Sequence, residues 1–142
     1  MLKYIFASHG ELAIALKHTL EMFLGEREDI ECFSMTKNKS GDEAEREIRA
    51  LLEKNQGNEL IVCTDLLGGS VNNIFTALLM EGFAFELIAG MNVPLLISLL
   101  TAYTEGSSDS IGAFVSEAQH GIVHINNMLN ERREEDDSTI SY

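Results

Sequence analysis

The sequence has few cysteines and no long apolar run, and each shortage excludes a class of protein. Only Cys32 and Cys63 occur in 142 residues, both inside predicted strands, so we expect buried reduced thiols and not a disulfide scaffold. No apolar run approaches the ~20 residues of a membrane helix. At the N-terminus no charged segment precedes an apolar stretch, so no signal peptide is indicated. These shortages predict a cytoplasmic protein.

Basic residues are also scarce. Lysine and arginine number 10 against 23 acidic residues, which gives a formal net charge of −13 at pH 7. A chain this acidic repels phosphate backbones, so nucleic-acid binding is not expected, whereas docking to a basic partner is favoured. Acids crowd residues 131–137, a pattern typical of a solvated segment. We therefore expect one domain over residues 1–130, followed by an acidic tail over residues 131–142.

Short apolar runs alternate with amphipathic segments along the chain. The predicted strands are Leu2–Ser8, Ile30–Met35, Glu59–Asp65 and Phe83–Ala89. The predicted helices are Glu11–Leu24, one opened by the capping box Ser40-Gly41-Asp42-Glu43, one from Ser70 to Gly82, Asn92–Tyr103 and Ser110–Leu129. Apolar strands separated by helices predict an α/β fold, with a doubly wound, mainly parallel sheet of order 2-1-3-4 covered by helices on both faces.

Two polar side chains stand where predicted strands end. His9 follows the first strand and Asp65 ends the third. With the order 2-1-3-4 these strands are neighbours about 4.8 Å apart, and ligands bind at this edge, where the strand order reverses. We expect the aspartate to accept a hydrogen bond from one ring nitrogen of the histidine and to leave the other nitrogen as a nucleophile.

Glycines lead into the helices that follow these two strands. Gly10 precedes the first helix, and Gly68-Gly69-Ser70 precedes the third. A helix N-terminus carries about half a positive charge and unpaired N–H groups, and glycine lets the backbone approach an anion closely. The pattern predicts that Gly10, Gly68, Gly69 and Ser70 bind a phosphate-like group, although Ser70 is also expected to cap its helix.

Other polar residues have ordinary explanations. His120 and His124 have the i,i+4 spacing of a metal face, but histidines on an exposed helix are more often solvated, so we predict neither a metal nor a cofactor. Asn92 opens the fourth helix at the same edge of the sheet as His9 and is a candidate for lining the site. Ser8 and Asn72 are candidates of the same kind.

Three motifs together resemble a known family. Ser8-His9-Gly10, the stretch Thr64-Asp65-Leu66-Leu67-Gly68-Gly69-Ser70 with Asn72-Asn73, and Ile88-Ala89-Gly90-Met91-Asn92-Val93-Pro94 are similar, in order and spacing, to the IIA component of the mannose-family sugar phosphotransferase system. The family often has tryptophan between the aspartate and the glycine pair, where this chain has Leu66-Leu67.

The resemblance implies a phosphoryl carrier. It implies that the phosphocarrier protein HPr donates a phosphoryl group to Nε2 of His9, that Asp65 orients the ring from Nδ1, and that a IIB component accepts the group. The membrane components IIC and IID would take part indirectly. It also implies a homodimer, in which an antiparallel edge strand is exchanged in many members; Ser138–Tyr142 is a weak candidate for that strand.

Two other functions stay open at this point. Ser70, His9 and Asp65 are the residue types of a hydrolase triad, although the sequence has no G-x-S-x-G elbow. The phosphotransfer subunit of dihydroxyacetone kinase also has a histidine after its first strand. The sequence does not indicate which sugar such a system would transport.

Overall fold

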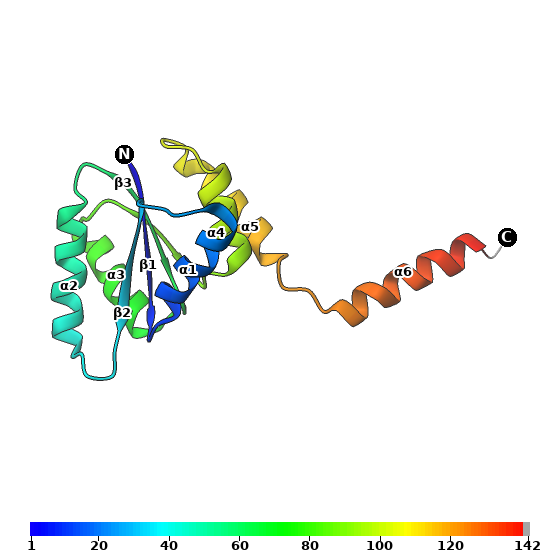
Figure 1. Cartoon of the computed structure of the whole chain (residues 1–142), viewed down its shortest axis with the longest axis horizontal. Helices are drawn as coiled ribbons and strands as arrows, with labels where there is room; N and C mark the ends of the chain where they lie inside the picture. Colours follow the sequence, from blue (N-terminus) through cyan, green and yellow to red (C-terminus); the bar gives the residue numbers. More distant parts are fainter. Residues whose placement is uncertain (141–142) are drawn as a thin grey trace.

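The computed structural model describes residues 1–140, with side chains up to residue 136. Four parallel strands form one sheet in the order β2-β1-β3-β4, which confirms the predicted topology (Figure 1). The strands are β1 (Leu2–His9), β2 (Ile30–Met35), β3 (Glu59–Thr64) and β4 (Glu86–Ala89). Cys32 and Cys63 both pair in register with Phe6, from opposite sides of β1, and both are free thiols.

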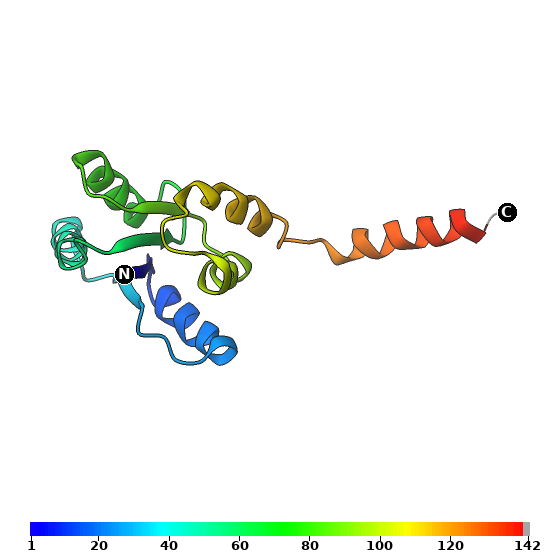
Figure 2. The ribbon, with the colours of Figure 1, turned by 90° about the horizontal axis from the view of Figure 1, so that it is seen from above.

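Helices cover both faces of the sheet (Figures 1 and 2). On one face lie α1 (Leu12–Leu24), α4 (Val93–Ala102) and α5 (Ile111–Gln119), and on the other lie α2 (Gly41–Lys54) and α3 (Ser70–Glu81). Alternate residues of β1 supply the two cores: Tyr4 and Phe6 pack with the first set, and Ile5 and Ala7 pack with the second. Burial on both faces explains why residues 4–7 of β1 are all apolar.

The predicted helix caps are present at two helices. Ser40 accepts a hydrogen bond at 3.1 Å from the backbone N–H of Glu43, as the capping box requires. Asn92 does the same for Leu95 at 2.9 Å, with Pro94 in the first turn of α4. The helices that follow β2 and β4 therefore start where their sequences place the caps.

Strand β4 is shorter than predicted. It begins at Glu86 and not at Phe83, because the aromatic residues before it pack in a loop against the α2–α3 face. Phe85 meets Phe75 of α3 edge-on, with the ring centroids 6.0 Å apart. Apolar side chains in this segment reflect helix packing, and not pairing in the sheet.

The last predicted helix is in fact two helices. After a short 3-10 helix, η1 (Ser108–Ser110), α5 ends at Gln119, and α6 (Ile125–Ile140) begins after a linker and stands away from the body (Figures 1 and 2). The turn at the break contains Gly121, which packs against α4 so closely that an added Cβ would lie 2.7 Å from Cγ of Pro94. His120 and His124 therefore do not share a helix face, and Nδ1 of His120 bonds instead to the carbonyl of Ser116 at 2.8 Å.

The candidate edge strand at Ser138–Tyr142 is not a strand as far as the structure reaches. Its residues up to Ile140 continue α6, and its last two lie outside the described residues. Over the described part of the chain, no helix combines the length and the apolarity needed to cross a membrane.

Candidate active site

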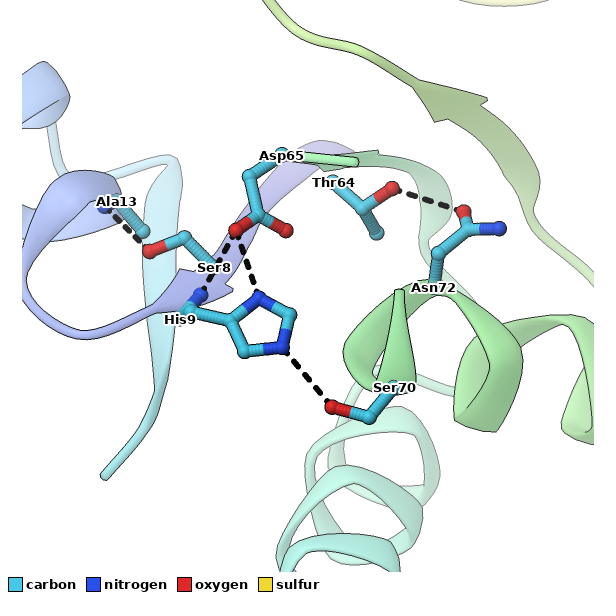
Figure 3. A network of polar contacts seen from close by, with 7 residues as sticks. All are labelled: Ser8, His9, Ala13, Thr64, Asp65, Ser70 and Asn72. Carbon is cyan, nitrogen blue, oxygen red and sulfur yellow. Dashed lines mark hydrogen bonds and ion pairs between the residues drawn. The ribbon is translucent and has the colours of Figure 1, made fainter. Parts of the chain in front are cut away.

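The predicted meeting of His9 and Asp65 is present at the carboxyl edge of the sheet. His9 is the last residue of β1, and Asp65 directly follows β3. Oδ2 of Asp65 lies 2.9 Å from Nδ1 of His9 and also accepts a hydrogen bond of 2.9 Å from the backbone N–H of His9 (Figure 3). The chain leaves β1 toward β2 and leaves β3 toward β4, so this pair occupies the topological switch point.

The carboxylate of Asp65 is largely enclosed. Its side chain is 12% exposed, and Oδ1 is buried without a hydrogen-bond partner among the described residues. Burial raises the pKa of Asp65. The hydrogen bonds from the backbone and ring of His9, together with the charge of that ring, lower the pKa by more than burial raises it, so the pKa lies below its ordinary value. Asp65 is therefore an anion at neutral pH, with an unshared negative oxygen close to the imidazole.

The hydrogen bonds fix the tautomer of His9. A carboxylate only accepts, so Nδ1 must carry the proton that points at Asp65. In the neutral ring Nε2 is then left with its lone pair, and it lies 2.9 Å from Oγ of Ser70, which donates to it (Figure 3). The ring is held at both nitrogens, yet the side chain is 45% exposed, so a reactant can reach it.

The prediction that Ser70 caps its helix is wrong. It is the first residue of α3, whose N-cap is Gly69, and no side-chain cap bond is formed there. The serine hydroxyl is consequently available to His9. Whether a serine at this point caps the helix or faces the ring depends on the extended backbone of Gly69 (φ −71°, ψ 161°), which sequence patterns do not reveal.

The glycines act through shape. An added Cβ at Gly69 would lie 3.2 Å from Cε1 of His9, so glycine lets the ring lie against this turn without displacement. Gly10 and Gly68 have φ values of +59° and +80°, which favour glycine. The N–H of Gly10 donates to the carbonyl of Met35, and that of Gly69 to the carbonyl of Leu66. The first turn of α3 also presents N–H groups that lack partners inside the helix.

Behind the site, two hydroxyls tie the strands to the helices. Oγ of Ser8 accepts a hydrogen bond of 2.8 Å from the N–H of Ala13, and Oγ1 of Thr64 donates to Oδ1 of Asn72 at 2.8 Å (Figure 3). The side chains of Ser8, Thr64 and Asn72 are all buried. Ser8 and Asn72 therefore hold the strands and helices beside the site in place and do not line its surface. Sequence reasoning missed Thr64, whose signal was a polar residue inside an apolar strand.

Asn92 has a different task. It caps α4, and its Nδ2 donates to the carbonyl of Ala118 at 3.0 Å, which joins α4 to α5. The structure thus brings His9, Asp65, Ser70 and Gly69 together. Asn92 instead joins α4 to α5.

Comparisons with known sequences point to one family. Residues 3–119 match the family of the PTS system fructose IIA component. The chain is 26% identical over 102 residues to the PTS system fructose-specific EIIA component of Bacillus subtilis (strain 168), covering 71% of this chain and 70% of that protein. It is 28% identical over 105 residues to the PTS system mannose-specific EIIAB component of Escherichia coli (strain K12), covering 73% of this chain but only 32% of that longer protein.

A solved structure agrees. One from Klebsiella pneumoniae, described as a phosphoenolpyruvate-dependent sugar phosphotransferase system permease, superimposes with a TM-score of 0.77 at 32% identity. The superposition covers 90% of this chain and 93% of that one.

Proposed function

We propose that this chain, which belongs to the family of the PTS system fructose IIA component, carries a phosphoryl group on Nε2 of His9 during sugar uptake. The observation that carries the proposal is the 2.9 Å contact between Nδ1 of His9 and Oδ2 of Asp65. This contact leaves a single ring nitrogen as the nucleophile, in a ring exposed enough to meet a second protein.

The transfer would proceed by in-line displacement. The lone pair of Nε2 attacks the phosphorus atom of the donor, and the bond between phosphorus and the donor breaks, so that its electron pair stays with the donor. The ring keeps its proton on Nδ1 and becomes cationic, a charge that the anionic Asp65 balances. The hydroxyl of Ser70 turns from Nε2 to a phosphoryl oxygen, beside the N-terminus of α3. Transfer to the acceptor reverses these steps.

The donor would be HPr and the acceptor a IIB component, with IIC and IID taking the sugar through the membrane. The alternative is that this chain is the phosphotransfer subunit of a dihydroxyacetone-kinase-type system, in which a kinase subunit accepts the phosphoryl group. Incubating the phosphorylated protein with a candidate IIB component or a candidate kinase subunit decides between the two systems. The true acceptor should remove the label much faster than the other protein does.

The experiment for the carrier function is direct. Incubation with phosphoenolpyruvate, enzyme I and HPr is expected to give an acid-labile phosphate that mass spectrometry places on His9 and that NMR places on Nε2. If the wild-type chain takes up no label from phosphorylated HPr, the proposal fails.

A serine hydrolase is the second candidate, because Ser70, His9 and Asp65 are joined in series at 2.9 Å and 2.9 Å. The two functions differ in the reacting atom, which is Oγ of Ser70 in a hydrolase and Nε2 of His9 in a carrier. A fluorophosphonate probe that labels Ser70 would favour the hydrolase.

Replacing Ser70 with alanine separates the two functions. In a carrier it removes one neutral hydrogen bond, so phosphoryl acceptance should slow about tenfold while the label still reaches full occupancy. In a hydrolase it abolishes reaction with the probe. Because Ser70 makes no cap bond, the melting temperature should stay near that of the wild type. Thr76→Ala, which alters a hydroxyl of α3 that bonds only to its own helix, is the matched control.

We also propose that the protein works as a homodimer and that α6 takes part in the contact. A lone helix of 16 residues is marginal in water, and every described side chain of α6 except Met128 is exposed, including the apolar Ile125 and Leu129. A division into a phosphotransfer domain at residues 1–130 and an acidic tail at residues 131–142 stays a prediction.

Removing residues 121–142 is expected to turn a dimer into a monomer, because it deletes this exposed apolar segment. Light scattering during size-exclusion chromatography measures the mass of both proteins. Glu134→Gln is the control. It changes an exposed carboxylate of α6 and leaves the apolar residues in place, so the dimer should stay intact. A full-length chain that is monomeric at micromolar concentrations would contradict the proposal.

A further inference from the structure

We propose that the first turn of α3 is braced on two sides, and that these braces hold the hydroxyl of Ser70 on Nε2 of His9. The outer brace is the side chain of Asn73, and the inner brace is the hydrogen bond between Thr64 and Asn72. These three residues act through Ser70 and are therefore positioning residues. The proposal rests on the carrier function above and adds what keeps the partner of the reactive nitrogen in place.

The backbone at the start of α3 has little of its own to fix it. Two glycines precede Ser70, and the N-cap residue, Gly69, has no side chain that could hold the first turn. The hydroxyl of Ser70 nevertheless lies 2.9 Å from Nε2 of His9, a contact that a small shift of the turn would break. A displacement of about 1 Å at a reacting group can cost about 10²-fold in rate. The contact therefore needs support from outside the glycine pair.

Asn73 gives that support on the outer side. Its Nδ2 donates to the carbonyl of Gly68 at 3.1 Å, and its backbone N–H donates to the carbonyl of Gly69 at 2.9 Å, so one residue holds both glycines. The residue is exposed, so its side chain is not needed to fill the core. Asparagine also favours a helix less than alanine does, so helix stability does not explain it. What the side chain adds is a fixed position for the turn.

Thr64 and Asn72 brace the inner side of the same turn. Oγ1 of Thr64 donates to Oδ1 of Asn72 at 2.8 Å, and both side chains are buried (Figure 3). Thr64 is itself held, because its carbonyl oxygen accepts the N–H groups of Gly90 at 3.0 Å and Met91 at 2.9 Å. It directly precedes the aspartate that holds Nδ1, and Asn72 follows the serine that holds Nε2 by two residues. The bond therefore fixes the gap between the two groups that hold the ring.

A double-mutant cycle in the full-length chain tests whether the outer brace acts through Ser70. Asn73→Ala alone is expected to slow single-turnover acceptance from phosphorylated HPr about fivefold, because the hydroxyl spends less time on Nε2. The double variant Asn73→Ala/Ser70→Ala should be no slower than Ser70→Ala, since the brace then has no hydroxyl to hold. Alanine favours the helix, so the melting temperature should not fall. Asn38→Ala, at an exposed asparagine in the turn after β2, is the matched control and should react like the wild type.

Two substitutions of Thr64 test the inner brace. Valine has the shape of threonine but no hydroxyl, so Thr64→Val should slow acceptance as Asn73→Ala does, whereas Thr64→Ser keeps the donor and should recover most of the wild-type rate. The ¹⁵N NMR signal of Nε2 is a second readout. In Thr64→Val and Asn73→Ala it should shift in the direction seen for Ser70→Ala, while the signal of Nδ1 stays in place. If Thr64→Val does not fold, the cycle on Asn73 still decides.

The outcomes separate the proposal from the carrier function. Losses that multiply, so that the double variant is about fiftyfold slower than the wild type, would mean that Asn73 acts apart from Ser70 and would overturn the proposal. A normal rate in Asn73→Ala, or a Thr64→Ser protein as slow as Thr64→Val, overturns it as well. All three results leave the carrier function standing, because the wild type is still labelled. A wild-type chain that takes no label overturns the carrier function itself.

Discussion

Replacing His9 with glutamine is expected to abolish phosphoryl acceptance, to below roughly a thousandth of the wild-type rate. Glutamine keeps a polar side chain, but the lone pair of an amide nitrogen is delocalised into the carbonyl group and does not attack phosphorus. Among the described residues the ring makes side-chain hydrogen bonds only to Asp65 and Ser70, and its side chain is 45% exposed, so the fold should survive. Label transfer from phosphorylated HPr, followed by electrophoresis, measures the loss.

His18→Gln and His120→Gln are the controls for this prediction. Both histidines are exposed and lie outside the site, so these variants should accept phosphate at the wild-type rate. A His9→Gln protein that still becomes labelled would move the phosphorylated residue elsewhere and would end the assignment of His9.

The meeting of His9 and Asp65 was predictable because it follows from topology. Neighbouring parallel strands end at the same edge, so the order 2-1-3-4 brings the residues at the ends of β1 and β3 within hydrogen-bond reach. Strands that are buried on both faces, and the helical crossovers that join them, predict the doubly wound parallel sheet in which such an edge exists. No detail of side-chain packing was needed for this part of the site.

Other features depend on contacts that are distant in sequence. The hydroxyl of Ser70 faces His9 because Gly69, and not Ser70, occupies the N-cap position. At the break between α5 and α6, Gly121 packs on Pro94, which lies in another helix. The apolar periodicity predicted one helix through this point, because periodicity indicates which face of a segment is apolar and not which residues that face contacts.

Replacing Asp65 with asparagine is expected to slow phosphoryl acceptance by roughly 10²–10⁴-fold. If the amide oxygen takes the place of Oδ2, Nδ1 keeps its proton, but the negative charge that balances the phosphorylated ring is gone, and an NH₂ group occupies the buried, unpartnered Oδ1 position. If the amide is turned round, its NH₂ faces the ring, and the proton moves from Nδ1 to Nε2, which then has no lone pair for attack. Both arrangements lower the rate, and single-turnover labelling measures it.

The same substitution should change how the free energy of unfolding falls at acidic pH. The pKa of Asp65 lies below its ordinary value in the folded chain, because the hydrogen bonds from His9 outweigh the effect of burial. A group of this kind stabilises the fold above its unfolded pKa of about 3.9, and the contribution disappears as the pH falls through the lower folded value. Wild type should therefore lose more of its free energy of unfolding below pH 4 than Asp65→Asn does, with Asp136→Asn, an exposed acid, tracking the wild type. Equal acid sensitivity in wild type and Asp65→Asn, together with an unchanged labelling rate, would mean that the carboxylate neither orients the ring nor balances its charge.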